Sequence, residues 1–352
     1  MSRAIRVLVV DDSALVRNIL SQGLSLDPGI EVVGTAPDPY IARDKIVELQ
    51  PDVLTLDVEM PRMDGVAFLR KLMPQYPIPI VMVSSLTQRG KQITMEALDA
   101  GAVDFVTKPT SNVAAGLTGM LMELRSKVKI ASTANVSHWK GRRPVVSSKS
   151  TVFTTSALAE STDKVIAIGA STGGTEAIRR VIENFPATTP GTVIVQHMPG
   201  GFTKMFSDRL NQLCQMQVKE AEHGDRVRTG LILIAPGGKQ MEVVRSGGFY
   251  QVRLGNEEKV SGHCPSVDVM MHSVSQHVGA NAVGAMLTGM GQDGAEGMLA
   301  MKQAGSRCIA QDEASSVVFG MPKVAFEKGG AERLVPLDKI STSLLSLLTE
   351  KK

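Results

Sequence analysis

Short apolar runs alternate with helix-patterned segments through the first third of the chain. The runs, each long enough for one strand, lie at residues 5–10, 31–34, 53–56, 78–83 and 104–106. Between and after them apolar residues recur at intervals of three and four, most clearly from Val113 to Val128. This alternation predicts a parallel sheet with helices on both faces, because each parallel connection needs a crossover segment.

The second half of the chain repeats the pattern. Val165–Ile168 is an apolar run, a glycine-rich turn follows, and apolar positions from Ile178 to Phe185 line one face of a helix. Further apolar strands occur in "TVIVQHMPGGF" and "NAVGAMLTGMGQDGAEGM", and both end in polar or glycine-rich turns. We therefore predict an α/β fold with two doubly wound parallel-sheet domains.

Periodicity is lost between these two halves. Residues 131–162 are rich in Ser, Thr and basic side chains, which cannot bury enough apolar surface to fold alone. A chain of 352 residues also exceeds one typical domain. We expect a first domain over residues 1–130, a flexible linker over 131–162 and a second domain over 163–352.

Composition is that of an ordinary globular protein, with 43% hydrophobic and 21% charged residues. A net charge of +3 is too small to indicate nucleic-acid binding, and no apolar run approaches the roughly 18 residues of a membrane span. The N-terminal residues enter a strand and then acids, without a signal-peptide pattern, so we expect a cytoplasmic protein that does not insert into membranes. The three cysteines are scattered, which favours reduced thiols.

Polar side chains follow the strands of the first domain. Asp11 and Asp12 follow the first strand, Asp57 the third, Ser84 the fourth and Lys108 the fifth. Carboxylates that meet at one edge of a sheet repel one another unless a divalent cation is present, and oxygen ligands of this kind suit Mg²⁺. Helix capping would account for one acid and leave Asp57 and Lys108 unexplained.

Ser171 lies in the glycine-rich turn of the second domain, within "GASTGG". A serine on a strand-to-helix turn matches the G-x-S-x-G pattern of a nucleophile, but such a loop can equally cradle a phosphate. The next strand ends in Gln196-His197, whereas a dinucleotide site would place an acid there. No Lys-Ser or Lys-Thr follows the glycines, so the loop is not a P-loop.

His197 and Asp293 each follow the end of a further strand in this domain. If those strands neighbour the strand before Ser171, the three side chains converge as nucleophile, base and orienting carboxylate. Met290 lies in the same turn as Asp293, where its backbone N–H could stabilise an oxyanion.

The first domain resembles a response-regulator receiver domain in its Asp11-Asp12 pair, the stretch "DVEMPRMDG", Ser84 and Lys108-Pro109. The resemblance implies a flavodoxin-like fold in which Asp57 accepts a phosphoryl group from a histidine kinase. It also implies that Lys108 and the Ser84 hydroxyl contact the phosphoryl oxygens. The Mg²⁺ site implied by the resemblance comprises Asp11, Asp12, Asp57 and the main chain of Glu59.

The whole chain is similar to the chemotaxis protein-glutamate methylesterase/protein-glutamine glutaminase family (the CheB family). The resemblance rests on "GASTGG", "VIVQHMP", "APGGKQ", "HCPSVDVMMHSV" and "LTGMGQDGAEGM", in this order behind a receiver. It implies a Rossmann-like esterase domain with Ser171, His197 and Asp293 as catalytic triad, oxyanion support from Thr172 and Met290, and no cofactor for the esterase reaction.

The implied substrates are γ-glutamyl methyl esters and certain glutamines on the cytoplasmic helices of methyl-accepting chemoreceptors. Gln240 and Cys264 depart from the family pattern, which often has histidine and a basic residue at these places. Neither belongs to the triad, so they bear on receptor contacts and not on the reaction.

Two other classes of protein would fit part of the sequence. A response regulator with a DNA-binding output would need a helix-turn-helix with a basic reading face, and the second half lacks this pattern. In a catalytically idle binding module, Ser171 would only cap its helix. The joint presence of Ser171, His197 and Asp293 favours the esterase.

Overall fold

The protein forms two compact units, which divide near residue 147. The computed structural model describes residues 3–61, 63–85, 87–109, 113–141 and 163–350. Most of the expected linker, residues 142–162, lies outside the described residues.

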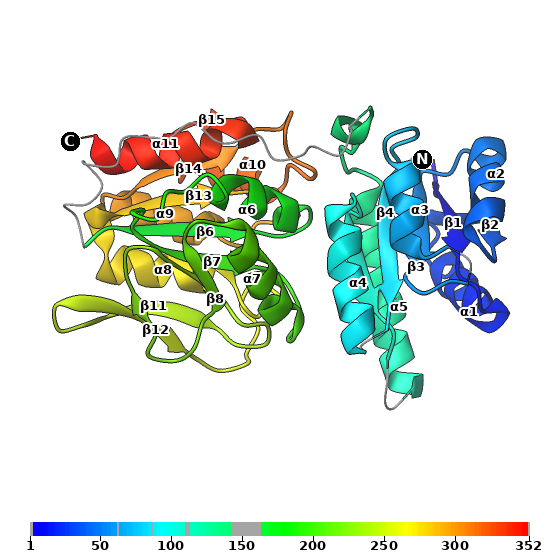
Figure 1. Cartoon of the computed structure of the whole chain (residues 1–352), viewed down its shortest axis with the longest axis horizontal. Coiled ribbons are helices and arrows are strands. Elements are labelled where there is room, and N and C mark those ends of the chain that lie inside the picture. Colours follow the sequence, from blue (N-terminus) through cyan, green and yellow to red (C-terminus); the bar gives the residue numbers. More distant parts are fainter. Residues whose placement is uncertain (1–2, 62, 86, 110–112, 142–162, 351–352) are drawn as a thin grey trace. The chain divides into compact units, whose positions relative to one another are not determined.

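The first unit is a five-stranded parallel sheet with helices on both faces (Figure 1). Its strands are β1 (Ile5–Val10), β2 (Ile30–Ala36), β3 (Val53–Asp57), β4 (Ile80–Ser84) and β5 (Asp104–Thr107). Its helices are α1 (Ala14–Ser25), α2 (Pro39–Leu49), α3 (Gly65–Leu72), α4 (Gln88–Asp99) and α5 (Val113–Ala131), with the 3₁₀ turn η1 (Ser137–Trp139).

The strand order β2-β1-β3-β4-β5 confirms the doubly wound fold expected for this unit. Right-handed crossovers place α1 with α5 on one face and α2, α3 and α4 on the other. Both β3 and β4 are buried along their whole length, as expected of strands covered on two faces. The carboxyl ends of β1, β3, β4 and β5 therefore meet at one edge of the sheet.

The chain after α5 packs on the first unit as far as residue 141. Val136 is buried, and the indole of Trp139 lies beside Gly101. A Cβ at Gly101 would lie 2.9 Å from this indole, and its φ of +110° also favours glycine. Residues 132–141, the first part of the segment expected as linker, thus have defined contacts.

The second unit contains a seven-stranded parallel sheet and a smaller antiparallel sheet. Its strands are β6 (Val165–Ala170), β7 (Gly191–Gln196), β8 (Gln217–Glu220), β9 (Arg226–Val227), β10 (Leu231–Ile234), β11 (Met241–Ser246), β12 (Phe249–Leu254), β13 (Ala282–Met286), β14 (Arg307–Gln311) and β15 (Leu334–Val335). Its helices are α6 (Gly174–Ile182), α7 (Phe202–Leu213), α8 (Val267–His277), α9 (Ala295–Gln303), α10 (Met321–Glu327) and α11 (Leu337–Thr349), with the 3₁₀ turn η2 (Gly279–Asn281).

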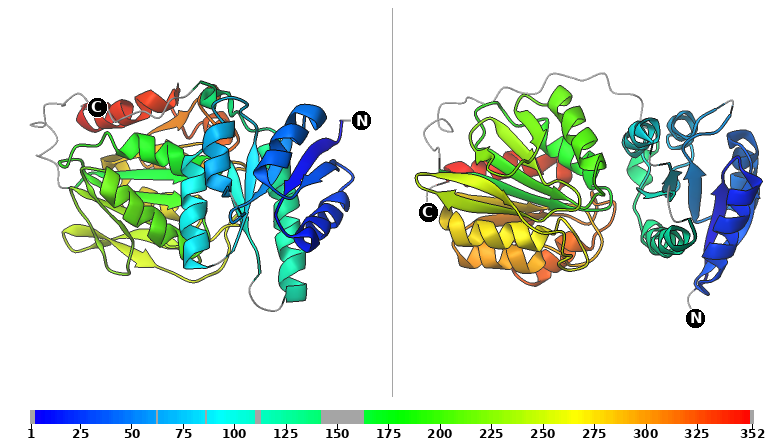
Figure 2. Two further views of the ribbon diagram at one scale, coloured as in Figure 1. Left: turned by 45° about the vertical axis from the view of Figure 1, so that its right-hand side comes forward. Right: turned by 90° about the horizontal axis from the view of Figure 1, so that it is seen from below.

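The parallel strands have the order β15-β14-β13-β6-β7-β10-β8. The chain moves from β6 toward one edge and then returns to build β13, β14 and β15 on the other side, so the order reverses beside β6. Helices α8 and α9 cover one face of this sheet, and α6 and α11 cover the other (Figure 2). In open α/β sheets ligands bind at such a switch point, outside the carboxyl ends of the strands.

The antiparallel sheet β11-β12-β9 was not predicted from the sequence. Strands β11 and β12 form a hairpin closed by Gly247-Gly248, a dipeptide that suits a tight two-residue turn. Helix α8 packs against β11 on one side and approaches β6 on the other. The approach requires Gly169, because a Cβ there would lie 2.3 Å from Val267 Cγ1.

Helices long and apolar enough to cross a membrane do not occur among the described residues.

Candidate active site

Ser171 and His197 directly follow neighbouring strands of the second unit. Ser171 comes after β6 and His197 after β7, and β6 lies between β7 and β13 in the sheet. Two backbone hydrogen bonds extend the ladder beyond the strand ends: Ser171 N donates to Thr288 O at 3.0 Å, and His197 N donates to Ala170 O at 3.1 Å. The backbone at Ser171 is thereby held between the segments that follow β13 and β7.

Glycines allow the close packing around Ser171. A Cβ at Gly289 would lie 2.7 Å from Ser171 Cβ and 2.4 Å from Met321 Sδ. A Cβ at Gly174 would lie 2.1 Å from Gln196 Oε1. These distances are shorter than van der Waals contact, so larger residues would displace the serine turn or its neighbours.

Asp293 pairs with the imidazole of His197. His197 Nε2 lies 2.7 Å from Asp293 Oδ2, and the two side chains are only 8% and 1% exposed. Asp293 follows β13 and precedes α9, so the sheet brings together residues that are 96 positions apart in the chain. Because the carboxylate accepts this hydrogen bond, Nε2 is the protonated nitrogen in the neutral ring.

The first turn of α8 also donates to the Asp293 carboxylate. Ser266 Oγ and Val267 N donate to it at 2.7 Å each, and Asp268 N donates at 3.2 Å. Burial opposes ionisation of Asp293, but the hydrogen bond and charge of His197 and the α8 donors outweigh it and hold the pKa below its ordinary value. The carboxylate is therefore ionised and fixed in place.

The second ring nitrogen of His197 and the Ser171 hydroxyl have no hydrogen-bond partner among the described residues. His197 Nδ1 is buried, and with Nε2 protonated it carries the free lone pair. An unpaired acceptor in a buried site is the arrangement that a general base needs before substrate arrives.

Thr172 belongs to the serine turn, and Met290 belongs to the segment between β13 and α9. Hydrogen bonds of Gly289 to Val318 and Gly320 fix the loop that carries Met290, whose own backbone N–H donates to no described residue. Thr172 is buried, and its carbonyl accepts from the Thr288 hydroxyl at 3.0 Å. The segment that follows β13 is thus tied to the serine turn.

Two further residues, which the sequence pattern did not single out, contact this site. Gln196 is buried, and its amide Nε2 lies 2.9 Å from Ser171 O and 3.2 Å from His197 O, so it links the two turns. His263 stacks on the His197 ring. Gln196 could have been found from sequence, because it is a polar residue at the end of an apolar strand. No local sequence pattern connects His263 with His197.

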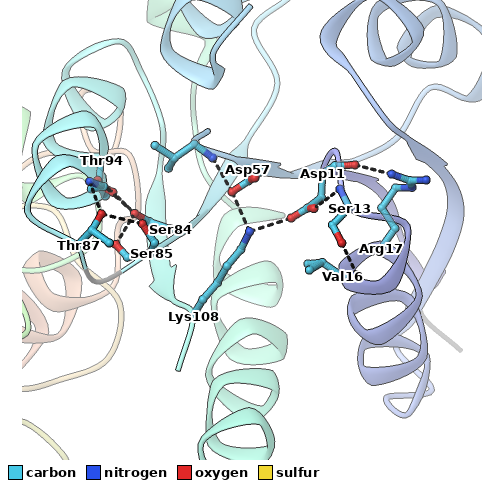
Figure 3. Close-up of polar contacts among 12 residues, drawn as sticks. Asp11, Ser13, Val16, Arg17, Asp57, Ser84, Ser85, Thr87, Thr94 and Lys108 are labelled. Atoms are coloured by element: carbon cyan, nitrogen blue, oxygen red, sulfur yellow. Dashed lines mark hydrogen bonds and ion pairs between the residues drawn. The ribbon is translucent and has the colours of Figure 1, made fainter. Parts of the chain in front are cut away.

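The predicted polar cluster of the first unit is assembled at the edge of its sheet. Lys108 Nζ lies 2.9 Å from Asp57 Oδ1 and 3.0 Å from Asp11 Oδ2 (Figure 3). Burial raises the pKa of Asp57 to about 6, against the opposing charge of Lys108. A buried carboxylate pair bridged by one ammonium group therefore forms the centre of this site.

A divalent cation fits the same cluster. Carboxylate oxygens of Asp11, Asp12 and Asp57 lie within 4.8 Å of one another. Hard oxygen donors at this spacing suit Mg²⁺, and Lys108 offsets only part of their charge. Glu59 lies two residues after Asp57, and its exposed side chain lies 3.9 Å from Arg89, outside the group of three carboxylates.

Ser84 is bonded to α4 and not to the acidic cluster. Its buried hydroxyl lies 2.6 Å from Thr94 Oγ1 and 3.2 Å from Gly90 O (Figure 3). Thr94 Oγ1 also lies 2.7 Å from Gly90 O. To contact a group on Asp57, the Ser84 hydroxyl must first leave these partners.

Known families match both units. Residues 166–344 match the CheB methylesterase model, and residues 7–115 match the response regulator receiver domain model. A Syntrophotalea carbinolica protein named protein-glutamate methylesterase/protein-glutamine glutaminase is 71% identical over the whole of both chains. A Salmonella typhimurium protein of the same name is 51% identical over 98% of this chain and 97% of its own.

A solved structure agrees with these matches. The second unit is similar to the crystal structure of the Thermotoga maritima CheB methylesterase catalytic domain, with 37% identity and a TM-score of 0.52. The match covers 53% of this chain and all of that one. The chain therefore belongs to the CheB family of protein-glutamate methylesterases/protein-glutamine glutaminases, with a response-regulator receiver domain ahead of the catalytic domain.

Proposed function

We propose that the second unit hydrolyses γ-glutamyl methyl esters on chemoreceptors by serine acyl transfer. The observation that carries this proposal is the buried His197–Asp293 pair at the end of a strand next to that of Ser171. Family membership supports the same activity, because the named relatives are methylesterases and glutaminases.

In the first step the Ser171 hydroxyl attacks the γ-carbonyl carbon of the substrate. His197 Nδ1, which has no partner among the described residues, accepts the hydroxyl proton. Asp293 stabilises the imidazolium that forms and keeps Nε2 as the donor. Backbone N–H groups at Thr172 and Met290 would donate to the oxyanion and so lower the barrier.

Collapse of the tetrahedral intermediate releases methanol, which takes its proton from His197. The γ-glutamyl group remains on Ser171 as an ester. Water then attacks this ester with His197 again as the base, and glutamate leaves while Ser171 regains its proton. A glutamine side chain presents the same carbonyl with ammonia as leaving group, so deamidation needs no further residue.

Methanol release from methylated receptor membranes tests this proposal. Ser171→Ala should reduce the rate to background, because no other nucleophile replaces the hydroxyl. The unfolding midpoint should change little, because the Ser171 hydroxyl makes no hydrogen bond to a described residue and Gly173, not Ser171, is the N-cap of α6. Release at the wild-type rate by a folded Ser171→Ala protein would refute the proposed mechanism.

For the receiver, we propose that Asp57 accepts a phosphoryl group from a histidine kinase and that this modification regulates the esterase. Asp11, Asp12, Asp57 and the Glu59 main chain would hold Mg²⁺, and Lys108 and Ser84 would contact the phosphoryl oxygens. Mg²⁺ supplies positive charge that offsets the charge of the transferred phosphoryl group. The proximity of the three carboxylates supports this assignment.

A small acyl phosphate donor tests the receiver. The wild type should be labelled on Asp57 and should release methanol faster after labelling. Asp57→Asn should remain unlabelled and unstimulated, because an amide is a poor nucleophile and carries no charge for the metal. Labelling that persists in Asp57→Asn would contradict the assignment of the acceptor.

The partners proposed for this chain follow from the two reactions. Methyl-accepting chemoreceptors present the esters and glutamines on their cytoplasmic helices, and a histidine kinase of the chemotaxis array provides the phosphoryl group. We propose that the chain acts in the cytoplasm at these receptors.

A further inference from the structure

His263 covers one face of the imidazole of His197. The two ring centroids are 3.7 Å apart, and the ring planes differ by 8°. The two rings therefore form a parallel stack, and His263 is in direct contact with the proposed general base. His263 comes from the segment between β12 and α8, whereas His197 follows β7.

We propose that His263 is a positioning residue, which holds the His197 ring in the plane that directs Nδ1 toward Ser171. This inference rests on the proposed role of His197 as general base. His263 itself neither accepts the proton nor contacts the reacting carbonyl. It acts through the orientation of the ring on which it stacks.

The contacts of His197 leave one rotation to be controlled. The ring is anchored at Nε2 by Asp293, and Nδ1 has no hydrogen bond among the described residues. A ring held at a single nitrogen can tilt about that hydrogen bond and carry the free nitrogen away from the serine. A flat neighbour in van der Waals contact with one face opposes this tilt. Orientation matters because misplacement of a reacting group by about 1 Å can cost about 100-fold in rate.

The backbone of His263 is fixed as a support of this kind requires. Its N–H donates to Val260 O at 2.9 Å, and its carbonyl accepts from Val260 N at 3.0 Å. The tight turn between them includes Ser261 and Gly262, both with positive φ. The His263 ring therefore projects from a turn closed by two backbone hydrogen bonds.

Gln240 ties this turn to the rest of the unit. Its buried amide Nε2 lies 2.8 Å from Glu258 O and 3.1 Å from His263 O, and its Oε1 accepts from Ser266 N at 2.8 Å. Ser266 in turn donates to Asp293. One side chain thus links the stacked histidine with the residue that orients the Asp293 carboxylate.

His263 stays neutral at neutral pH. Burial and the neighbouring His197 lower its pKa to about 4. The charged groups that act on it are His197 and Lys259, which disfavour its protonation, and Asp293, which favours it. A neutral ring offers its π face to the imidazolium formed during catalysis, whereas a second positive charge would oppose that step.

Ring shape and hydrogen bonding are separated by three variants of the full-length chain. His263→Ala removes the stack, His263→Phe keeps a flat ring without a titrating nitrogen, and His263→Gln keeps a polar side chain without a ring. His272→Ala is the matched control, because His272 is an exposed histidine on α8. Unfolding midpoints establish that each variant is folded.

Two rates are measured for each variant. Methanol release from methylated receptor membranes gives kcat and KM. Inactivation by a small aryl sulfonyl fluoride reports the reactivity of Ser171 alone: the serine oxygen bonds to sulfur, fluoride leaves, and His197 takes the proton. The second rate requires no receptor binding, so it separates positioning of the base from recognition of the substrate.

We expect His263→Ala to lower kcat by about 10- to 100-fold with KM nearly unchanged, and to slow sulfonylation similarly. His263→Phe should retain most of both rates, His263→Gln should resemble His263→Ala, and the control should match the wild type. Since the Phe variant keeps an aromatic ring in the stack, it tests the proposal even if the Ala variant fails to fold.

Wild-type kcat in both His263→Ala and His263→Gln would overturn the inference. It would also be overturned if KM rose while sulfonylation stayed unchanged, because His263 would then be a substrate contact. Failure of the proposed function is a distinct result, in which Ser171→Ala still releases methanol.

Discussion

Replacement of Asp293 by asparagine tests the chemistry of the site most directly, because the change removes a charge and keeps the shape. Geometry decides how the amide lies. Oδ2 accepts from His197 Nε2 and from Val267 N, both at 2.7 Å, while Oδ1 faces the Ser266 hydroxyl at 2.7 Å. Oδ1 also accepts from Asp268 N, but at the longer distance of 3.2 Å. A backbone N–H cannot accept a hydrogen bond, but a hydroxyl can, so an amide nitrogen at the Oδ1 place keeps Ser266 as a partner and loses only this longer bond. We therefore expect the amide nitrogen at the Oδ1 place, toward Ser266, and the amide oxygen still facing His197.

In this orientation His197 keeps Nε2 as donor, and the loss comes from the missing charge. A carboxylate and an imidazolium with charge centres about 4 Å apart interact by about 4 kcal/mol at an effective dielectric constant of about 20. At about 1.4 kcal/mol per tenfold change, kcat should fall about 10³-fold. The weaker hydrogen bonds to the α8 donors should cost about 2 kcal/mol of stability, or roughly 4–8 °C in the unfolding midpoint of this unit.

The assay is methanol release from methylated receptor membranes, with kcat and KM determined separately for wild type and Asp293→Asn. Thermal unfolding of the same preparations gives the stability change. A fall in kcat of less than tenfold would refute the electrostatic coupling of Asp293 to His197. A fall well beyond 10⁴-fold would refute the amide orientation, because it would indicate a reversed His197 tautomer that blocks proton transfer from Ser171.

Three further predictions concern packing, acid stability and the receiver. Gly289→Ala should lower kcat/KM for methanol release by at least about tenfold, because the new Cβ would lie 2.7 Å from Ser171 Cβ and displace it; an unchanged value would contradict this packing. His263 has a pKa of about 4 in the folded protein, so between pH 6.5 and 4 the unfolded chain takes up a proton that the folded chain does not, and stability falls as pH falls. Urea unfolding at pH 7 and pH 5 measures this fall in the free energy of unfolding. The fall should be smaller in His263→Phe than in wild type by up to about 2 kcal/mol, and an equal fall in both proteins would show that His263 does not cause it. Thr94→Val removes a partner of the Ser84 hydroxyl in the unphosphorylated receiver, so labelling by a limiting acyl phosphate should rise about fivefold; a decrease would show that Thr94 supports the phosphorylated form instead.

Much of the fold could be predicted from local sequence. The alternation of apolar runs and helical stripes located β1, β3 and β5 to within a residue or so, because burial on both faces of a parallel sheet leaves a continuous apolar run. Deviations lie at element ends: β2 extends through Ala36, and β4 begins at Ile80 where the expected strand begins at Ile78. The hairpin of β11 and β12 was missed because its polar residues interrupt the apolar pattern.

The polar residues of both sites were likewise accessible from sequence, since each follows an apolar run. Ser171, His197 and Asp293 were selected as residues that follow separate strands, as were Asp11, Asp57 and Lys108 in the receiver. Sequence alone could state only a condition, namely that the strands be neighbours. Local periodicity reports which face of an element is buried, and it carries no information on which strand pairs with which.

Tertiary structure decided that condition and the contacts that depend on it. The order β13-β6-β7 brings Asp293 to His197, 96 residues away in the chain. The contact with Asp293 makes His197 Nε2 the hydrogen-bond donor and leaves Nδ1 as the free acceptor among the described residues. It also places the first turn of α8 on the Asp293 carboxylate and the His263 ring on His197. Such contacts join segments with no common pattern, because they arise from the packing of a loop and a helix onto a finished sheet. Sequence therefore determined which residues are candidates for the chemistry, and only the folded sheet determined how they are held.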